Sequence, residues 1–495
     1  MSKRGSPSFW DYRDKRQRMM VDKDSLRDFE TVIDIAKRVK KLGGRALLVG
    51  GSVRDRLLGL SPKDFDLEVY GVGMEHLSAA LAEAYVLDMV GASFGVLKIH
   101  HHEIDVALPR RETRLGKGHR DFATDFDPAI TIEEAASRRD FTINAIYQDP
   151  LTGEVIDPVG GAADLKSGVL RHVSKHFVED PLRVLRGMQF VARFNLDPVD
   201  ETIALCRDMV QNTLPRERLF EEWSKLILKG VAISKGLLFL KKTGWVRYYP
   251  ELKRLIGCRQ APQWHPEGDV WNHTCHALDA FAAVRDGKDS RCEFIGDFKS
   301  WTRHDNLIVG FATLCHDFGK PLSSYFDRKI GRIRSIGHDE KGVAPTLSFL
   351  RRLTNEERIL KEVAPLVRLH MRVYALWEGN AGDAAIRRLS AQVGRIDRLL
   401  RVAAADDSAR PPLPLNVEPL IWMKRTAERL DVEKSAPEMI VKGRDIVELG
   451  YKPSPQFGIW LRKCYDAQLD GEFSDHEHGI SYLKEKVIHK SKFGS

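Results

Sequence analysis

The sequence has no long apolar runs, no closely spaced cysteine pairs and no internal repeats, and each absence excludes a class of protein. No stretch approaches the roughly 20 apolar residues of a transmembrane helix. The six cysteines form no Cys-x-x-Cys pair, which argues against a disulfide framework or a zinc finger and for reduced thiols inside a cell. Residues 1–20 are basic, but no apolar segment follows them, so we expect no secretory signal.

The composition is that of a globular protein with several domains. The chain has 495 residues, which is too long for one ordinary core, and 43% of them are hydrophobic while 30% are charged. The formal net charge is +8. Excess Lys and Arg favour a polyanionic partner because they displace counterions from phosphates, although many basic proteins bind no nucleic acid. We expect a cytoplasmic protein with no membrane partner.

The spacing of apolar residues separates a mixed head from a helical remainder. Residues 25–42 have helical spacing, and β-type segments then recur until about residue 160. Helical periodicity continues almost to the C-terminus, beginning with a predicted helix over 181–194. The prediction is an α+β fold that comprises a basic N-terminal extension (1–25), an α+β head (26–160), a helical neck (161–262), a second helical domain (263–425) and a helical tail (426–495).

The first candidate for a functional site is the segment LVGGSVRDRLLGL (48–60), in which two glycines separate a predicted strand from a predicted helix. Gly50 and Gly51 would let backbone amides approach a phosphate closely, and the helix N-terminus favours anions. Arg54 would add a charged contact to triphosphate oxygens. The same pattern also fits a tight turn that binds no ligand.

Two carboxylates follow in the segment KDFDLEVYG (63–71). Residues two apart on a strand point to the same face, so Asp64 and Asp66 are expected to project together. Adjacent carboxylates repel each other unless a cation lies between them, which makes the pair a candidate site for two Mg²⁺ ions. Asp105, on another β-type segment, would approach the same ions. The alternative is a pair of solvated acids on an edge strand.

Charges of both signs meet in the third segment, ASRRDFTINAIYQD (136–149). Arg139 and Asp140 directly precede a predicted apolar helix, and Asn144 is four residues after Asp140. An arginine on a phosphate beside an aspartate that accepts from a ribose hydroxyl would explain this mixture. An ion pair at a helix N-terminus would explain it equally well.

The order and spacing of these three segments resemble the head of the DNA polymerase β-type superfamily, in its bacterial class II tRNA nucleotidyltransferase branch. That branch contains CCA-adding enzymes and poly(A) polymerases, and residues 171–194 are similar to its neck helix. The resemblance implies a polymerase β-type nucleotidyltransferase head followed by an all-helical neck, a further domain and a tail. It implies Mg²⁺-dependent, template-independent addition of CCA to the tRNA 3′ end from CTP and ATP, with release of pyrophosphate.

The resemblance also assigns roles to individual residues. Asp64, Asp66 and Asp105 would be the catalytic carboxylates, and the nucleotide would be bound by Gly50, Gly51, Arg54, Arg139, Asp140, Asn144, Glu179, Asp180, Arg183 and Arg186. The last four would lie on the neck helix that reads the base. Gln189 stands where close relatives often carry another arginine, so one nucleotide contact is in doubt. A flexible loop over 109–122 would help to switch the pocket from CTP to ATP.

Histidines and aspartates recur in the helical block after residue 264. They lie in WNHTCH (271–276), LCHDFGK (314–320), GHDEKG (337–342), VRLHM (367–371) and AADDSARPP (404–412). Neutral imidazoles with carboxylates suit Ni²⁺, Mn²⁺ or a similar transition metal, or Mg²⁺. Their order resembles the HD phosphohydrolase superfamily, which implies His273, His316, Asp317 and Asp406 as metal ligands and His338 and His370 as further ligands or phosphate contacts.

The second resemblance implies that this domain hydrolyses phosphoesters, as a 2′,3′-cyclic phosphodiesterase or a phosphatase. Asp406 fits the family position better than Asp407, and His276 is out of register. The domain could also be a tRNA-binding platform that has kept its ligands. The whole chain could instead be a CC- or A-adding enzyme, a poly(A) polymerase, an HD hydrolase with an inactive head or a non-catalytic RNA-binding protein. The oligomeric state is left open.

Overall fold

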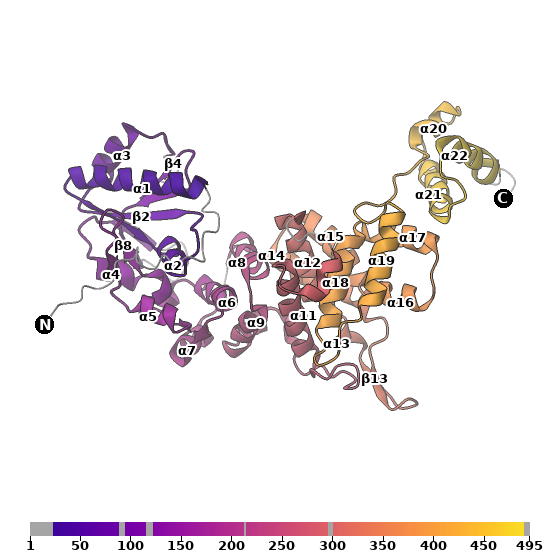
Figure 1. The fold of residues 1–495 in the computed structure, drawn as a ribbon, viewed down its shortest axis with the longest axis horizontal. Coiled ribbons are helices and arrows are strands. Elements are labelled where there is room, and N and C mark those ends of the chain that lie inside the picture. Colours follow the sequence, from indigo (N-terminus) through magenta and orange to yellow (C-terminus); the bar gives the residue numbers. More distant parts are fainter. Residues whose placement is uncertain (1–22, 89–94, 115–121, 212–213, 296–299, 490–495) are drawn as a thin grey trace. The chain divides into compact units, whose positions relative to one another are not determined.

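The structure, a computed structural model, describes residues 23–88, 95–114, 122–211, 214–295 and 300–489. The chain divides into two compact units, one of Met1–Gly187 with Phe194–Asn212 and one of Met188–Arg193 with Thr213–Ser495. The first unit contains the main sheet, and the second is helical apart from one short hairpin (Figure 1). This is the α+β class that the sequence predicts.

The first unit begins with the predicted helix and continues through short strands. Its elements are α1 (Lys23–Lys41), β1 (Arg45–Val49), α2 (Gly51–Leu57), β2 (Phe65–Tyr70), α3 (Met74–Ala82), β3 (Leu87–Asp88), β4 (Val96–Ile99), β5 (Ile104–Ala107), β6 (Arg110–Arg114), β7 (Phe122–Phe126), α4 (Ile132–Ser137), η3 (Thr142–Asn144), β8 (Tyr147–Gln148), β9 (Val155–Ile156), α5 (Gly161–Lys166), β10 (Val169–Leu170), η4 (Lys175–Glu179), α6 (Leu182–Phe194, shared with the second unit), β11 (Asp197–Pro198) and α7 (Asp200–Asp208).

Seven strands form the main sheet in the order β3-β4-β5-β2-β1-β8-β9. The β2–β5 pair is parallel, and the other neighbouring pairs are antiparallel. Strand β2 alternates between buried residues, such as Phe65, Leu67 and Val69, and more accessible acids. Because neighbouring side chains on a strand point to opposite faces, this alternation gives the sheet one dry face and one face that can hold polar groups.

Helix α1 covers the dry face of the sheet. Its side chains Val32, Ile35, Ala36 and Val39 are buried in one cluster with residues of β1, β2, β4 and β5. Burying an aliphatic side chain of this size contributes roughly 1.5–3 kcal/mol, so the helical spacing of α1 anchors it to the sheet. The opposite face of the sheet carries the acidic residues discussed below.

The second unit consists mainly of helices. Its elements are α8 (Arg216–Lys229), α9 (Ile233–Lys242), η5 (Trp245–Tyr248), α10 (Pro250–Lys253), α11 (Val270–Arg285), η6 (Ser290–Ile295), α12 (Arg303–Cys315), α13 (Lys320–Ser323), β12 (Tyr325–Asp327), β13 (Arg332–Arg334), α14 (His338–Leu353), α15 (Glu357–Leu369), α16 (Arg372–Glu378), α17 (Asp383–Val393), α18 (Ile396–Ser408), α19 (Val417–Arg429), α20 (Gly443–Glu448), α21 (Pro455–Asp470), α22 (His476–Tyr482) and the π-helical η8 (Leu483–Ile488).

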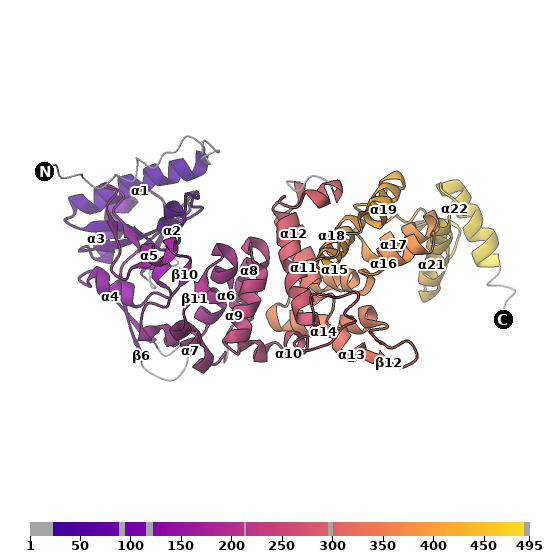
Figure 2. The ribbon, with the colours of Figure 1, turned by 60° about the horizontal axis from the view of Figure 1, so that its bottom comes forward.

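Five helices of this unit form the framework for the predicted histidine and aspartate ligands. Helix α11 packs against α12 and α18, and α15 packs against α12 and α14 (Figure 2). Asp269 caps the N-terminus of α11 by accepting from the backbone amide of Asn272, 2.9 Å away. Further along the chain, α20, α21 and α22 form a small core around Trp460 and Phe473. Within the described residues, no helix is both long and apolar enough to cross a bilayer.

Two predictions of local structure were wrong. The helix predicted over 181–194 is confirmed as α6, but the placement of Glu179 and Asp180 on it is wrong. The residue before a proline avoids the helical region, and Asp180 is accordingly extended (φ −120°, ψ 105°). Glu179 lies in the short helix η4, so neither acid is on the neck helix. In the segment 109–122, predicted as a loop, residues 110–114 pair with 122–126 as antiparallel strands β6 and β7. The intervening residues 115–121 lie outside the described part of the chain.

Candidate functional site

The three predicted segments of the head meet beside strand β2. Asp66 lies opposite Asp105 in the parallel pair β2–β5, and opposite Val49 in the antiparallel pair β1–β2. Val49 directly precedes the glycine turn. A Cβ atom at Gly50 would lie 3.5 Å from Arg139 Nη1 and 3.9 Å from Asp66 Oδ2. The turn, the carboxylates and Arg139 therefore border one site.

Glycine is required at the centre of this site. Gly50 has φ 73° and ψ −127°, a conformation that residues with a side chain rarely adopt. Its carbonyl accepts the first backbone hydrogen bond of α2, from Arg54 N at 3.1 Å. The turn thus delivers backbone amides and a helix N-terminus next to Arg139 and Asp66, without a side chain to fill the space between them.

Positive charge compensates the carboxylates of the head only in part. The pKa of Asp66 is raised to about 6 because the surrounding protein desolvates it and Asp64 repels its charge, while Arg139 partly offsets both effects. Asp105 is paired with Lys98, whose Nζ lies 3.0 Å from Oδ1. Asp64 lies two residues before Asp66, just ahead of β2, and is exposed. A divalent cation at this position would remove the repulsion that raises the pKa of Asp66.

A buried polar chain supports the rim of this site. The Arg54 guanidinium donates to Asn144 Oδ1, the Asn144 amide donates to Asp140 Oδ1 at 3.0 Å, and Arg186 Nε donates to Asp140 Oδ2 at 2.6 Å. Burial alone would raise the pKa of Asp140, but Arg186 and the bond from Asn144 outweigh it and lower that pKa. Four residues predicted to touch the nucleotide therefore also hold one another in place.

Arg139 lies at the other side of the glycine turn. Its Nη2 is 3.4 Å from Glu68 Oε1, and its Nε donates to the Tyr147 hydroxyl at 3.3 Å. These contacts fix the guanidinium beside Gly50, in a position where it can face a phosphate. Glu68 and Tyr147 were not predicted as site residues. Glu68 is separated from Asp66 by one residue of the same strand, so the two side chains point to the same face. The alternation of buried and accessible residues along β2 could therefore have identified Glu68.

The predicted base-reading residues are bonded mainly to the backbone. Arg183 donates from Nη1 to His176 O and from Nη2 to Arg138 O, both at 2.7 Å. Asp180 Oδ1 accepts from Leu182 N at 3.0 Å, which caps α6. Glu179 Oε1 lies 2.8 Å from His176 Nδ1. These bonds order the start of the neck helix, and reading of a base by these side chains stays a prediction.

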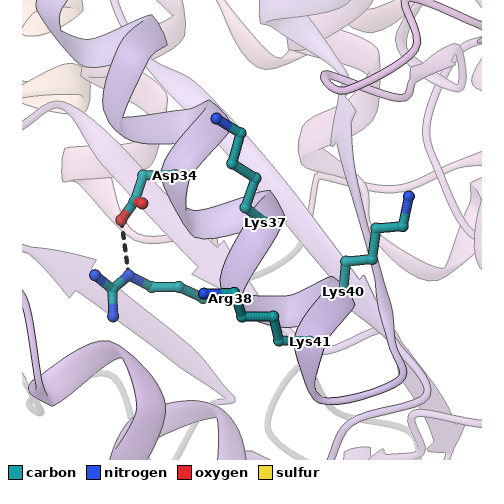
Figure 3. Close-up of a pocket in the computed structure, with 5 residues that line it drawn as sticks. All are labelled: Asp34, Lys37, Arg38, Lys40 and Lys41. Carbon is teal, nitrogen blue, oxygen red and sulfur yellow. Dashed lines mark hydrogen bonds and ion pairs between the residues drawn. The ribbon is translucent and has the colours of Figure 1, made fainter.

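Two further features of the chain lie outside this arrangement. Gln189 is buried, and its Oε1 has no hydrogen-bond donor. A surface hollow on α1 is bordered by Asp34, Arg38 and three lysines (Figure 3). Asp34 and Arg38 pair at 2.7 Å, and none of the predicted site residues lines this hollow.

In the second unit, the helices bring all six predicted ligands together. His273 lies on α11, His316 and Asp317 follow α12, His338 begins α14, His370 follows α15, and Asp406 lies on α18. Their possible ligand atoms form two groups in which all atoms lie within 4.8 Å of one another, namely His273 with His316 and Asp406, and Asp317 with His338 and His370. Among the described residues, groups this tight occur only in the second unit; the carboxylates of the head form none.

Two imidazoles of this cluster, those of His338 and His370, present unprotonated nitrogens to each other. In His316, His338 and His370, Nδ1 lies 2.6–2.8 Å from a backbone carbonyl oxygen, which can only accept, so Nδ1 carries the proton. The Nε2 atoms of His338 and His370 are then lone-pair donors, and they face each other at 3.2 Å. Nε2 of His316 lies 3.3 Å from Asp317 Oδ2, where either a proton or a metal ion can bind between them. Two facing lone pairs repel unless a cation binds both. Histidines that ligate metals are oriented in this way by backbone or carboxylate partners.

The buried carboxylate of Asp317 also lacks hydrogen-bond donors. Asp317 is buried, and neither of its oxygens has a hydrogen-bond donor of good geometry, although Lys320 Nζ lies 2.7 Å from Oδ2. Burial opposes protonation of His316, but Asp317 and Asp406 outweigh it and raise its pKa to about 9. Burial and the neighbouring His338 lower the pKa of His370 to about 4. This donor set fits a divalent metal.

Three residues around this cluster were not predicted as site residues. Glu267 is buried and accepts from His273 Nδ1 at 2.7 Å and from His265 Nδ1 at 2.9 Å. Burial would raise the pKa of Glu267, but these two bonds lower it to about 2. Lys320 bridges Asp317 and the side-chain oxygen of Gln260. Lys320 belongs to the HDFGK motif, so its place beside His316 and Asp317 in the sequence could have identified it as a site residue. Nothing in the sequence pairs Glu267 with His273.

The structure also distinguishes between candidate metal ligands that are neighbours in the sequence. Asp406 Oδ1 lies 2.9 Å from His273 Nε2, whereas Asp407 accepts from the backbone amide of Asn416 and pairs with Arg410. His276 is exposed on α11, away from the buried face that carries His273. The cluster therefore contains the aspartate favoured by the sequence and lacks the excluded histidine.

Comparison with known proteins agrees with both the fold and the head. Residues 46–171 match the poly(A) polymerase head domain family. The multifunctional CCA protein of Xanthomonas campestris is 35% identical over 379 residues, covering 73% of this chain and 85% of the relative. That of Xanthomonas oryzae is 36% identical over 439 residues, covering 85% and 97%. The crystal structure of the Bacillus stearothermophilus CCA-adding enzyme with CTP is 22% identical, with a TM-score of 0.62 over 94% of this chain and 99% of that chain.

The sheet, the glycine turn and the paired aspartates define the first unit as a polymerase β-type nucleotidyltransferase head. The chain belongs to the family of class II tRNA nucleotidyltransferases, and within it to the multifunctional CCA proteins. It is an enzyme of the nucleotidyltransferase class, whose chemistry depends on a divalent metal.

We expect the ion pair between Asp140 and Arg186 to make the stability of the head depend on pH. Asp140→Asn should lower the unfolding free energy of the first unit by about 2 kcal/mol at pH 7, because Arg186 loses its charged partner. Since the folded-state pKa of Asp140 lies below its ordinary value of 3.8, the contribution is present above that value and is lost as the pH falls through the folded pKa. Thermal unfolding of both forms at pH 7 and at pH values stepped well below 3.8 measures the difference, which should shrink once the pH falls through the folded pKa. An equal difference at both pH values would contradict the assignment.

We expect divalent metal to stabilise the second unit through the histidine–aspartate cluster. At a free metal concentration 100-fold above Kd, the stabilisation is about 2.7 kcal/mol. Calorimetric unfolding with Mn²⁺ or Ni²⁺ against a chelator should show a raised midpoint in the native protein and in His276→Ala, and a much smaller increase in His338→Ala. A midpoint that ignores metal, or the same loss in His276→Ala, would exclude the cluster as a metal site.

Proposed function

We propose that the head adds CCA to the 3′ end of tRNA from CTP and ATP, without a template, and releases pyrophosphate. The observation that carries this proposal is the meeting of Asp66, Asp105, Gly50 and Arg139 at one point of the sheet. Phosphates and divalent cations can share such a site because it offers backbone amides and a guanidinium on one side and carboxylates on the other. The printed names of the relatives at 35–36% identity support the choice of reaction.

Asp64 and Asp66 would hold the catalytic metal, which we assign as Mg²⁺, and Asp105 would complete the acidic side. A bound Mg²⁺ supplies a lowered pKa for the attacking hydroxyl and neutralises charge on the leaving pyrophosphate. The head carboxylates are not preassembled as tightly as the second cluster. The triphosphate would therefore supply oxygens that complete the metal's coordination, which couples metal binding to nucleotide binding.

The remaining head residues would bind and orient the nucleotide. The amide of Gly51, with Arg139 and Arg54, would face the triphosphate, while Asp140 would accept from the ribose. The amide of Gly50 donates to Ile146 O, so Gly50 would contribute the space that its missing side chain leaves. The tRNA 3′-oxygen then forms a bond to the α-phosphorus as the bond to pyrophosphate breaks in line. We assign Asn144 and Arg186 to holding Asp140, because both are bonded to it.

Selection of C and A is assigned to the start of the neck helix. Asp180 and Arg183 would present an acceptor and donors to the Watson–Crick edge of the incoming base, and Glu179 would hold His176 beside them. The backbone bonds of Arg183 and Asp180 support this role in one respect, since they fix both side chains before a nucleotide arrives.

We further propose that the histidine–aspartate cluster hydrolyses phosphoesters with a bound divalent metal, such as Ni²⁺, Mn²⁺ or Mg²⁺. The observation that favours this second function is the pair of Nε2 atoms of His338 and His370, which face each other beside the buried carboxylate of Asp317. A bound metal supplies an activated hydroxide. His273, His316, Asp317 and Asp406 would hold it, with Glu267 orienting His273. His338 and His370 would add ligands or contact the phosphate.

The transfer reaction is tested by extension of a tRNA lacking CCA, resolved to single nucleotides, with Mg²⁺ and CTP, ATP or both. We expect addition of C, C and A and no more, with both nucleotides required. Two C residues, or a single A on a tRNA ending in CC, would identify a partial enzyme. A long ladder of A would identify a poly(A) polymerase.

The two sites are separated by matched substitutions in the full-length chain. Asp66→Ala should lower the rate of transfer by at least about 10³-fold, because the metal loses a ligand, and should leave hydrolysis of 2′,3′-cyclic AMP unchanged. His316→Ala should have the reverse effect. Loss of both activities in either variant would contradict two independent sites.

A further inference from the structure

The hairpin β12–β13 lies between two proposed metal ligands in the sequence, and hydrogen bonds at its base connect it to one of them. It lies between Asp317 and His338, two of the proposed ligands. At its base, the hydroxyls of Ser324 and Ser335 are hydrogen-bonded at 2.7 Å, and Ser335 O accepts from His338 Nδ1 at 2.8 Å. The hairpin is therefore rooted on the residue that orients one ligand of the cluster, and it extends away from the helices (Figure 2).

One face of the hairpin combines an exposed aromatic ring with guanidinium groups. The register places Tyr325 opposite Arg334 and Asp327 opposite Arg332, so these four side chains share a face. Tyr325 is 47% exposed, and Arg332 and Arg334 are exposed as well. Arg334 lies 3.5 Å from Asp327 Oδ2. Among the described residues, Arg332 has no ion-pair partner, so its charge is uncompensated.

The other features of the hairpin strengthen its positive charge. The turn adds Arg328 and Lys329, both exposed, so the segment 325–334 has four basic residues and one acidic residue. Phe326 and Ile333 form a separate, apolar pair on the opposite face. A two-stranded hairpin gains little stability by itself, and a ring left exposed on it is not explained by a core.

We propose that the Tyr325 face of this hairpin docks the single-stranded 3′ end of an RNA and directs its terminal phosphoester to the histidine–aspartate cluster. This proposal rests on the hydrolytic function proposed for that cluster. Single-stranded nucleic acid is bound by an aromatic platform on which a base stacks and by cations that follow the phosphates, and both are present here. The negative charge of RNA complements the hairpin, and the root at Ser335 makes the docking surface continuous with the cluster.

The test uses the full-length protein with two probes, a labelled single-stranded RNA of about 10 nucleotides that ends in a 2′,3′-cyclic phosphate, and 2′,3′-cyclic AMP. Tyr325→Ala and Arg332→Ala should each raise KM for the RNA about tenfold, as expected for one lost stacking or phosphate contact, and leave both constants for cyclic AMP unchanged. Arg332→Ala should also reduce the slope of log K against log salt concentration for RNA binding by about 1, as expected for one lost phosphate contact. Lys361→Ala, exposed on α15, is the control and should behave as the native protein. Phe326→Ala removes the ring on the opposite face, which is 60% exposed, and should leave KM for the RNA unchanged because docking uses the Tyr325 face.

The outcomes separate this proposal from the one on which it rests. Equal RNA binding in all variants would overturn the docking role, and would leave a protein partner as the reason for the exposed face. A parallel loss with cyclic AMP would also overturn it, because the hairpin would then act only by holding His338. If neither probe is hydrolysed but Tyr325→Ala and Arg332→Ala still raise the Kd of the RNA, the hydrolytic function falls and the docking surface stands.

Discussion

Both proposed sites depend on one constraint, which is the repulsion between chemically similar groups that lie close together. The groups are imidazole nitrogens in the second unit and carboxylates in the head. In the second unit, Nε2 of His338 and Nε2 of His370 are 3.2 Å apart while their Nδ1 atoms donate to carbonyl oxygens. In the head, Asp66 has Asp64 and Asp105 as neighbours, and its pKa is raised to about 6 by desolvation and this repulsion. Such arrangements are unfavourable alone, and a divalent cation converts each of them into a binding site.

The two sites meet this constraint in different ways. The six ligands of the cluster come from helix ends and one helix face within a packed core, so they are fixed before any metal binds. The carboxylates of the head project from a strand and from the segment before it. Asp64 and Asp66 are accessible to solvent, although enough protein surrounds Asp66 to raise its pKa. A preformed cage favours a resident metal, whereas an open acidic edge allows metal and nucleotide to arrive and leave together. That difference suits hydrolysis at one site and repeated nucleotide addition at the other.

Much of this arrangement was predictable from short-range rules. The glycine turn, the alternation of β2 and the order of histidines and aspartates are local patterns, and the α+β class followed from them. The position of Asp180 off the helix is also encoded locally, because Pro181 restricts the residue before it. The three-residue spacing between Asp180 and Arg183 masks this signal, since it is equally typical of two residues on one helix face.

Other parts depend on contacts between distant residues. The pairing of Asp66 with Asp105 is a matter of strand register across 39 positions, and the bond from His273 to Glu267 depends on how an irregular segment folds back on α11. The hydrogen-bonded chain Arg54–Asn144–Asp140–Arg186 joins α2, η3 and α6 through Asp140, which lies just before η3. The sequence identified these four residues only as separate nucleotide contacts, because no periodicity records which buried polar groups satisfy one another.

The most direct test of the account is anomalous X-ray diffraction from crystals of the protein grown with Mn²⁺ and a non-hydrolysable CTP analogue. In the head, we expect an anomalous peak coordinated by Asp64, Asp66 and the triphosphate. In the histidine–aspartate cluster, we expect a second peak at about 2.0–2.3 Å from at least two imidazole Nε2 atoms. Without the analogue, the head peak should weaken much more than the cluster peak. Imidazoles hydrogen-bonded to Asp317, with no metal between them at saturating Mn²⁺, would contradict the assignment of the cluster as a metal site.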